Sequence, residues 1–221
     1  MTPEAVHSLV RAIEAKDMTT AAHTWRVVLY ARAMAEESGI SHELVARITT
    51  GAALHDIGKL DIPDEILRKP GPLTPEEFET IKTHAAKGHD RLVAMGEHDP
   101  IVLELIRHHH ERWDGSGYPD GLRGEQISPG ARYFAVIDSF DAMTSLRPYR
   151  CETGVRAARH AIEELQAGSG SRYWPRAVET FARLQETGRL DWISEYFNDR
   201  CEVAYDHADP VAVARVIARR N

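Results

Sequence analysis

The sequence lacks several features that mark other classes of protein. Two cysteines among 221 residues, Cys151 and Cys201, are too few for a disulfide framework and are typical of the reducing cytosol. No apolar run approaches the roughly 18 residues of a membrane-spanning helix, and the first residues lack the basic and apolar regions of a signal peptide. Basic blocks are also absent, and the formal net charge is −7. We therefore expect a cytoplasmic protein that binds neither a nucleic-acid polymer nor a membrane.

Helical periodicity runs through the chain, and no stretch shows the sustained alternation of apolar and polar residues that is typical of strands. Gly39 follows an apolar stripe and predicts a helix end, and Thr74, Pro75 and Glu77 form a strong helix start. The sequence therefore predicts an all-α fold. The expected helices cover residues 3–16, 20–38, 42–56, 75–87, 99–111, 130–146, 152–167, 175–187, 189–199 and 209–220.

Histidine is frequent, with 12 residues, and five of these fall on apolar faces or ends of the expected helices. His109 and His110 extend an apolar stripe by steps of four from Leu105 and Ile106. The other members are His23, His55 and His84. For any one of them, a hydrogen-bonded core histidine is the ordinary interpretation. Five imidazoles that converge from separate helices would need five sets of hydrogen-bond partners, so a metal site explains the set better.

Two carboxylates join this set of histidines. Asp56 follows His55 directly, and its two oxygens allow it to bridge two cations. Asp138 lies in an apolar helix, where a buried carboxylate needs a cation; an arginine partner is the alternative to a metal. Five imidazoles and two carboxylates suit two transition metal ions, whereas thiolates would mark structural zinc and oxygen ligands alone would suit magnesium or calcium.

Three long segments of the sequence resemble the motifs of a known protein family. They are LHDIGKLDIPDEILRKPGPLT at 54–74, HHERWDGSGYPDGL at 109–122 and IDSFDAMTSLRPYR at 137–150. The sequence resembles the HD-GYP family of metal-dependent phosphodiesterases, a branch of the HD phosphohydrolase superfamily, and the tripeptide at 117–119 is the one that names the family. The resemblance implies a compact helical bundle of the HD-domain type. We expect a short N-terminal helix at 1–18, a catalytic domain at 19–185 and a C-terminal helical extension at 186–221.

The resemblance also implies an activity, the hydrolysis of cyclic di-GMP to pGpG by a hydroxide that bridges two divalent ions. The resemblance does not determine whether pGpG is cleaved further to GMP. Iron and manganese both suit the ligand set. Some family members carry a glutamate, a ligand for a third metal, where this chain has Thr19, so we expect a binuclear site.

The resemblance assigns roles to individual residues. The implied metal ligands are His23, His55, Asp56, His84, His109, His110 and Asp138. Asp56 and Lys59 would be catalytic, with Asp56 as the bridging carboxylate and Lys59 beside the phosphate. The implied substrate-binding residues are Lys59, Gly117, Tyr118, Arg147 and Arg150. Alternatively, the two arginines are solvated surface charges without a role in binding. Tyr118 could alternatively anchor its loop by packing on Trp113.

Two other functions compete with a cyclic di-GMP phosphodiesterase. One is an HD phosphohydrolase of another nucleotide, including a different cyclic dinucleotide. The other is a module that senses a cyclic dinucleotide or docks a signalling partner with little turnover. An intact ligand set favours the enzyme. Because a sensory domain is not apparent in the sequence, we expect regulation through a homodimer, a signalling protein or metal supply.

Overall fold

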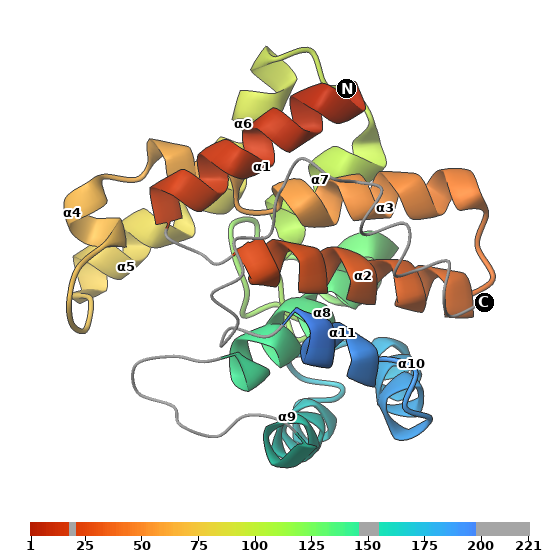
Figure 1. Ribbon diagram of the computed structural model, residues 1–221. Helices are drawn as coiled ribbons and strands as arrows, with labels where there is room; N and C mark the ends of the chain where they lie inside the picture. Colours follow the sequence, from red (N-terminus) through yellow and green to blue (C-terminus); the bar gives the residue numbers. More distant parts are fainter. Residues whose placement is uncertain (18–20, 146–154, 198–221) are drawn as a thin grey trace.

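The chain folds as a bundle of helices (Figure 1). The computed structural model describes residues 1–17, 21–145 and 155–197, and within these ranges it contains helices and no strand, which confirms the predicted all-α class. The elements are α1 (Pro3–Asp17), α2 (Ala21–Glu37), α3 (His42–Leu54), η1 (Ile57–Asp61), α4 (Asp64–Leu67), α5 (Pro75–Lys82), α6 (His84–Ala94), α7 (Pro100–His108), η2 (Gly124–Gln126), α8 (Pro129–Thr144), α9 (Val155–Ala167), α10 (Pro175–Glu186) and α11 (Asp191–Tyr196). None of the described helices is both long and apolar enough to cross a membrane.

The expected helix at 75–87 is wrong in one respect, because the structure has two helices there. The predicted start is present: the Thr74 side chain accepts from the backbone N–H of Glu77, and the Glu77 carboxylate accepts from that of Thr74. The helix stops at Lys82, and Thr83 separates α5 from α6. The break places His84 at the first turn of a new helix. The expected helix at 209–220 lies outside the described residues.

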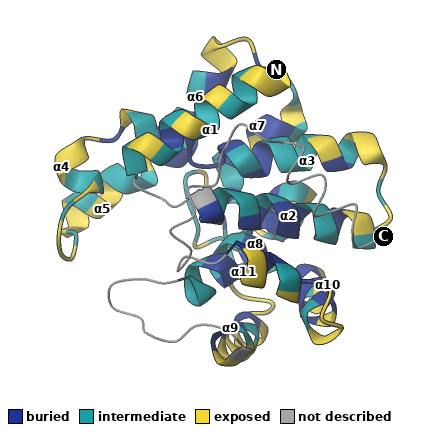
Figure 2. Cartoon of the chain, viewed as in Figure 1, coloured by how far each residue is buried: buried dark blue, intermediate teal, exposed yellow. Residues whose placement is uncertain are grey.

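In the described part of the chain, the core consists of two apolar clusters, and Figure 2 shows buried residues on α2, α7 and α8. One cluster includes the aromatic side chains of α2, α8 and α10, such as Tyr30, Phe134 and Phe181. The other joins α1, the end of α3, η1, α6 and α7. The ring of Phe134 lies 4.9 Å from that of His55 and 6.1 Å from that of His109, centroid to centroid. These two histidines are buried against the first cluster, and Leu54 and Ile57 of the second cluster flank His55 in the chain.

Candidate metal centre

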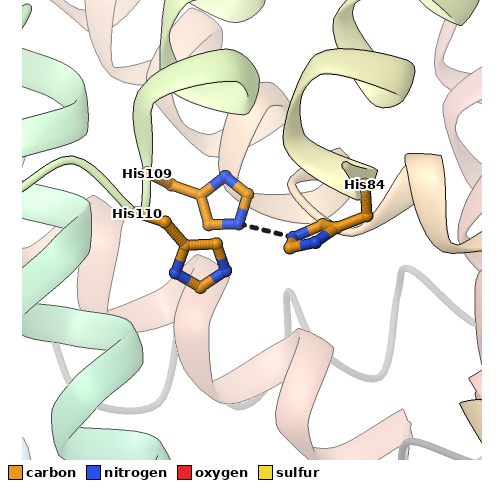
Figure 3. A group of neighbouring side chains, drawn as sticks. All are labelled: His84, His109 and His110. Atoms are coloured by element: carbon orange, nitrogen blue, oxygen red, sulfur yellow. Dashed lines mark hydrogen bonds between the residues drawn. The ribbon is translucent and has the colours of Figure 1, made fainter. Parts of the chain in front are cut away.

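Two groups of side chains in the described part of the chain are spaced to hold a metal ion. One consists of His84, His109 and His110, and the other of His23, His55 and Asp56. The candidate ligand atoms in each group lie within 4.8 Å of one another. Figure 3 shows the first group, in which His84 from the start of α6 and the two histidines that follow α7 face a common point. All six residues are among the predicted ligands.

Three of the imidazoles are oriented in the same way. The Nδ1 atoms of His55, His84 and His109 each donate to the carbonyl oxygen three residues earlier, at 2.8 Å. This bond fixes the ring and leaves Nε2 as the atom that faces the site. All three residues lie at helix termini, where carbonyl groups without a helical partner are common. The helix ends therefore select one tautomer for each ligand.

The Nε2 atoms of His84 and His109 lie only 3.2 Å apart (Figure 3). Burial lowers the pKa of both residues, and that of His109 is well below its usual range. Both imidazoles are therefore neutral at pH 7, and since each Nδ1 carries the proton, two lone pairs face each other. Two nitrogens bound to one cation at about 2.1 Å would be separated by roughly 3 to 3.5 Å. The donor set fits a cation at this point.

Asp56 connects the two groups. Its Oδ2 lies 3.2 Å from Nε2 of His55, and its Oδ1 lies 3.5 Å from Nε2 of His84. Burial favours the neutral acid, but His55 and Lys59 outweigh it and hold the pKa of Asp56 well below its usual range. The carboxylate is thus charged and presents a different oxygen to each group, as a bridging ligand requires.

Gly58 allows the Asp56 segment to approach α6. A Cβ at this position would lie 1.9 Å from the carbonyl oxygen of His84 and 2.5 Å from the backbone nitrogen of Gly88. No larger side chain fits without moving one backbone from the other. The contact, rather than a special backbone angle, is the reason for glycine here, and it brings Asp56 within reach of His84.

His23 is oriented by a buried network of charges. Its Nδ1 lies 2.7 Å from Oδ2 of Asp141, which has no exposed surface. Arg26 donates to both oxygens of Asp141, from Nε at 2.5 Å and from Nη2 at 3.0 Å. Burial would raise the pKa of Asp141, but His23 and Arg26 outweigh it and lower the pKa. Arg26 also donates to Ser145 Oγ and to the carbonyl oxygen of Phe197, so α8 and α11 both support the site.

Lys59 lies beside Asp56; the role that the resemblance implies for it stays a prediction. Its Nζ is 2.8 Å from Oδ2 of Asp56 and 2.5 Å from Oδ2 of Asp17. Burial disfavours the ammonium, but these two carboxylates outweigh burial and raise the pKa of Lys59. The result is a fixed positive charge next to the candidate metal centre.

Asp138 belongs to neither three-residue group. It is half-buried on α8, and its charge raises the pKa of His55 and opposes the lowering of that of His110. It therefore lies within electrostatic reach of both groups. Its role as a ligand stays a prediction.

The Gly-rich segment places Tyr118 against the centre. The ring of Tyr118 lies 4.8 Å from that of His110, and its backbone N–H donates to the His110 carbonyl oxygen at 3.3 Å. Trp113 stacks instead on Trp174, with centroids 6.2 Å apart. Burial, together with the charges of Asp138 and Asp56, raises the pKa of the Tyr118 phenol, so the hydroxyl stays protonated at neutral pH.

Gly117 and Glu111 hold this segment close to α7. A Cβ at Gly117 would lie 2.4 Å from the backbone nitrogen of Arg112. The buried Glu111 carboxylate accepts from the N–H groups of residues 120, 121 and 122, at 2.7 to 3.0 Å. Gly117 therefore permits close packing, and Glu111 ties down the loop that carries Tyr118.

Sequence reasoning missed three residues that support the centre: Arg26, Glu111 and Asp141. A signal existed for each. Arg26 follows His23 by three residues and Asp141 follows Asp138 by three, on the same helical faces. Glu111 is a carboxylate between a histidine pair and a Gly-rich segment whose backbone donors need partners. The predicted substrate residues Arg147 and Arg150, and Thr19, lie outside the described residues.

Comparison with known proteins gives the family. The sequence model of the HD domain matches residues 7–177. A cyclic di-GMP phosphodiesterase of Thermotoga maritima is 44% identical over 185 residues, which are 83% of this chain and 49% of that protein. The 3'3'-cGAMP-specific phosphodiesterase 2 of Vibrio cholerae is 37% identical over 177 residues, 80% of this chain and 33% of that protein. The chain thus spans between a third and a half of the length of these relatives.

A solved structure agrees with this at the level of the fold. The crystal structure of a cyclic GMP-AMP specific phosphodiesterase of V. cholerae superposes with a TM-score of 0.65 at 17% identity, over 97% of this chain and 52% of that one. The HD-domain match covers most of the chain. It includes the adjacent residues His55 and Asp56, and Asp56 lies close to imidazoles of both groups of candidate ligands. The chain belongs to the HD domain family, in its HD-GYP branch.

Proposed function

We propose that the chain is a phosphodiesterase that hydrolyses cyclic di-GMP to pGpG with the help of two divalent cations. The observation that carries this proposal is the position of Asp56, whose two oxygens face imidazoles of two different groups. A carboxylate shared in this way is the bridging ligand of two-metal sites that hydrolyse phosphate esters. The relative from T. maritima, named as a cyclic di-GMP phosphodiesterase, supports the choice of substrate.

The proposed ligands would divide between two cations. His84, His109 and His110 would hold one, His23 and His55 would hold the other, and Asp56 would serve both. Asp138 on α8 would complete the set. Imidazole and carboxylate ligands accept iron and manganese alike, so we propose one of these two metals.

The side chains around the centre act on the scissile phosphate. Divalent cations, when bound, supply positive charge to the phosphate and lower the pKa of water. Lys59, fixed by Asp56 and Asp17, adds positive charge for the phosphate oxygens as negative charge develops on them. The protonated phenol of Tyr118 donates a hydrogen bond to the substrate, and Gly117 borders it. Arg147 and Arg150 contact the phosphates and the guanine bases.

Hydrolysis adds the oxygen of water to phosphorus and breaks the bond to the 3′ oxygen. A proton from water ends on that oxygen, which becomes a 3′ hydroxyl, and the phosphate stays on the 5′ oxygen of the next nucleoside. One such step opens the cyclic dinucleotide to pGpG, and a second would yield GMP.

The test incubates the protein with cyclic di-GMP and either manganese(II) or iron(II), then separates the products by chromatography. We expect pGpG to accumulate, and the same separation reports any GMP. Parallel incubations with 3'3'-cGAMP show whether another cyclic dinucleotide is the better substrate. Binding of cyclic di-GMP without loss of substrate in either metal would identify a sensor and overturn the proposal.

We also propose that the chain acts in the cytoplasm, as its low cysteine content favours. A homodimer or a signalling protein is the partner we propose. Light scattering during size-exclusion chromatography tests the dimer, and a mass that stays at 24.8 kDa over a wide range of protein concentrations would contradict it.

A further inference from the structure

Helix α5 stands apart from the core although it lies next to the candidate metal centre. None of its residues is buried (Figure 2). Of its two large apolar residues, Ile81 is half-buried, whereas Phe78 is 47% exposed. An aromatic side chain this exposed contributes little to folding, because the hydrophobic effect depends on the area removed from water. The position of Phe78 therefore needs another explanation.

Lys82 connects Phe78 to the centre. Its Nζ lies 5.2 Å from the centroid of the Phe78 ring and 5.6 Å from that of the Tyr118 ring. The ammonium group thus contacts two aromatic rings, one on α5 and one in the Gly-rich segment. Since Tyr118 lies against His110, these three side chains form a continuous path from the metal centre to the surface of α5.

The present partner of Lys82 is easily replaced. Nζ lies 2.6 Å from Oε1 of Glu79, whose side chain is 68% exposed. Exposed ion pairs of this kind contribute little to stability. A ligand phosphate therefore competes with Glu79 for the ammonium at small cost.

We propose that Phe78 and Lys82 form a subsite for the half of a cyclic dinucleotide that is not being cut. This inference rests on the proposed function. A cyclic dinucleotide has two phosphates, of which only one can lie at the metal centre. Lys82 binds the other phosphate, and the exposed face of Phe78 stacks on a base, as aromatic side chains do in many nucleic-acid sites.

The test compares two substrates on the manganese-loaded protein. Cyclic di-GMP occupies both the metal centre and the subsite, whereas bis(p-nitrophenyl) phosphate is a small diester without a second phosphate or a purine. For Phe78→Ala and Lys82→Gln, we expect the ratio of kcat/KM for cyclic di-GMP to that for the small diester to fall by about tenfold or more. Most of the fall should come from KM for cyclic di-GMP.

Conservative and matched variants separate this role from a structural one. Phe78→Tyr keeps the aromatic face and Lys82→Arg keeps the charge, so both should retain most of the wild-type ratio. Lys87→Gln and Met95→Ala make the same kinds of change on α6 and just after it, and they should leave the ratio as it is. A ratio that stays within twofold of wild type in both Phe78→Ala and Lys82→Gln would overturn the subsite.

The same experiment distinguishes failure of the subsite from failure of the proposed function. If the wild-type protein cleaves the small diester but not cyclic di-GMP, the substrate assignment is wrong. If the wild-type protein cleaves cyclic di-GMP and the variants at 78 and 82 do so equally well, only the subsite is wrong.

Discussion

The metal centre and helix α5 use polar groups in different ways. At the centre, Asp141 is fully buried and its charge is held by His23 and Arg26. On α5, Lys82 pairs with an exposed glutamate, and no residue of the helix is buried. A buried charge must be paired and hydrogen-bonded, so each partner fixes the next. Side-chain orientation is therefore determined by buried partners at the centre, whereas Lys82 on α5 is held by a partner that is exposed to solvent.

The largest effect is expected at the bridge between the two histidine groups. Asp56→Ala removes the carboxylate whose oxygens lie 3.2 Å from Nε2 of His55 and 3.5 Å from Nε2 of His84. We expect kcat/KM for cyclic di-GMP to fall by about 10²- to 10³-fold or more, with fewer metal ions per chain by elemental analysis. Asp90→Asn, on the exposed surface of α6, is the control. Full activity of Asp56→Ala would show that the site is assigned wrongly.

The network behind His23 should affect metal binding more than substrate binding. Asp141→Asn removes the charge that orients His23 and leaves the buried Arg26 without its carboxylate partner. Loss of such an outer partner typically lowers metal affinity by about 10- to 100-fold. Titration with manganese measures this, and the free energy of unfolding should also fall, by about 3–5 kcal/mol. Unchanged manganese affinity would show that the contacts from α8 and α11 do not support the metal centre.

The pH dependence of metal binding should depend on His55. Burial lowers the pKa of His55, but the neighbouring Asp56 outweighs burial and raises it to about 8 in the metal-free protein. A metal ligand must be neutral, so a cation has to displace this proton below about pH 8. Manganese affinity should therefore rise about tenfold per pH unit from roughly pH 6 to 8 and then level off.

Calorimetry in buffers of different ionisation enthalpy should detect about one proton released per chain at pH 7. His89→Gln, a change on the outer side of α6, should leave this release intact. An affinity that does not change with pH would contradict a protonated His55 in the metal-free protein.

The smallest effect compares the same loss of a helix cap in the two regions. Ser41 caps α3, which carries buried residues, and Thr74 caps α5, which carries none. Ser41→Ala should lower the free energy of unfolding by about 1 kcal/mol. Thr74→Ala should leave it nearly unchanged and instead speed amide hydrogen exchange in α5. Equal losses of global stability would show that α5 is part of the core unit.

The sequence predicted the fold class and most helices because apolar periodicity and capping residues act locally. The same periodicity placed His109 and His110 on an apolar stripe, and the structure brings both imidazoles to one centre. The split at Thr83 was missed because the strong start at Thr74 carries no information on where the helix ends. In consequence, His84 was expected inside a helix rather than at the start of one.

The hydrogen bonds of Arg26 and Asp141 that support His23 could not be predicted from apolar periodicity. Arg26 donates hydrogen bonds to Asp141, 115 residues away in the sequence, and to the carbonyl oxygen of Phe197, 171 residues away. Periodicity shows which face a residue occupies but not what packs against it. The role of Gly58 is hidden for the same reason, since the backbone that it contacts belongs to α6.

Anomalous diffraction from crystals grown with manganese tests the central claim most directly, namely that Asp56 joins two cation sites. We predict two peaks, about 3.5–4 Å apart, on either side of the Asp56 carboxylate, one near His84, His109 and His110 and one near His23 and His55. A single peak, or two peaks of which neither contacts Asp56, would contradict the account.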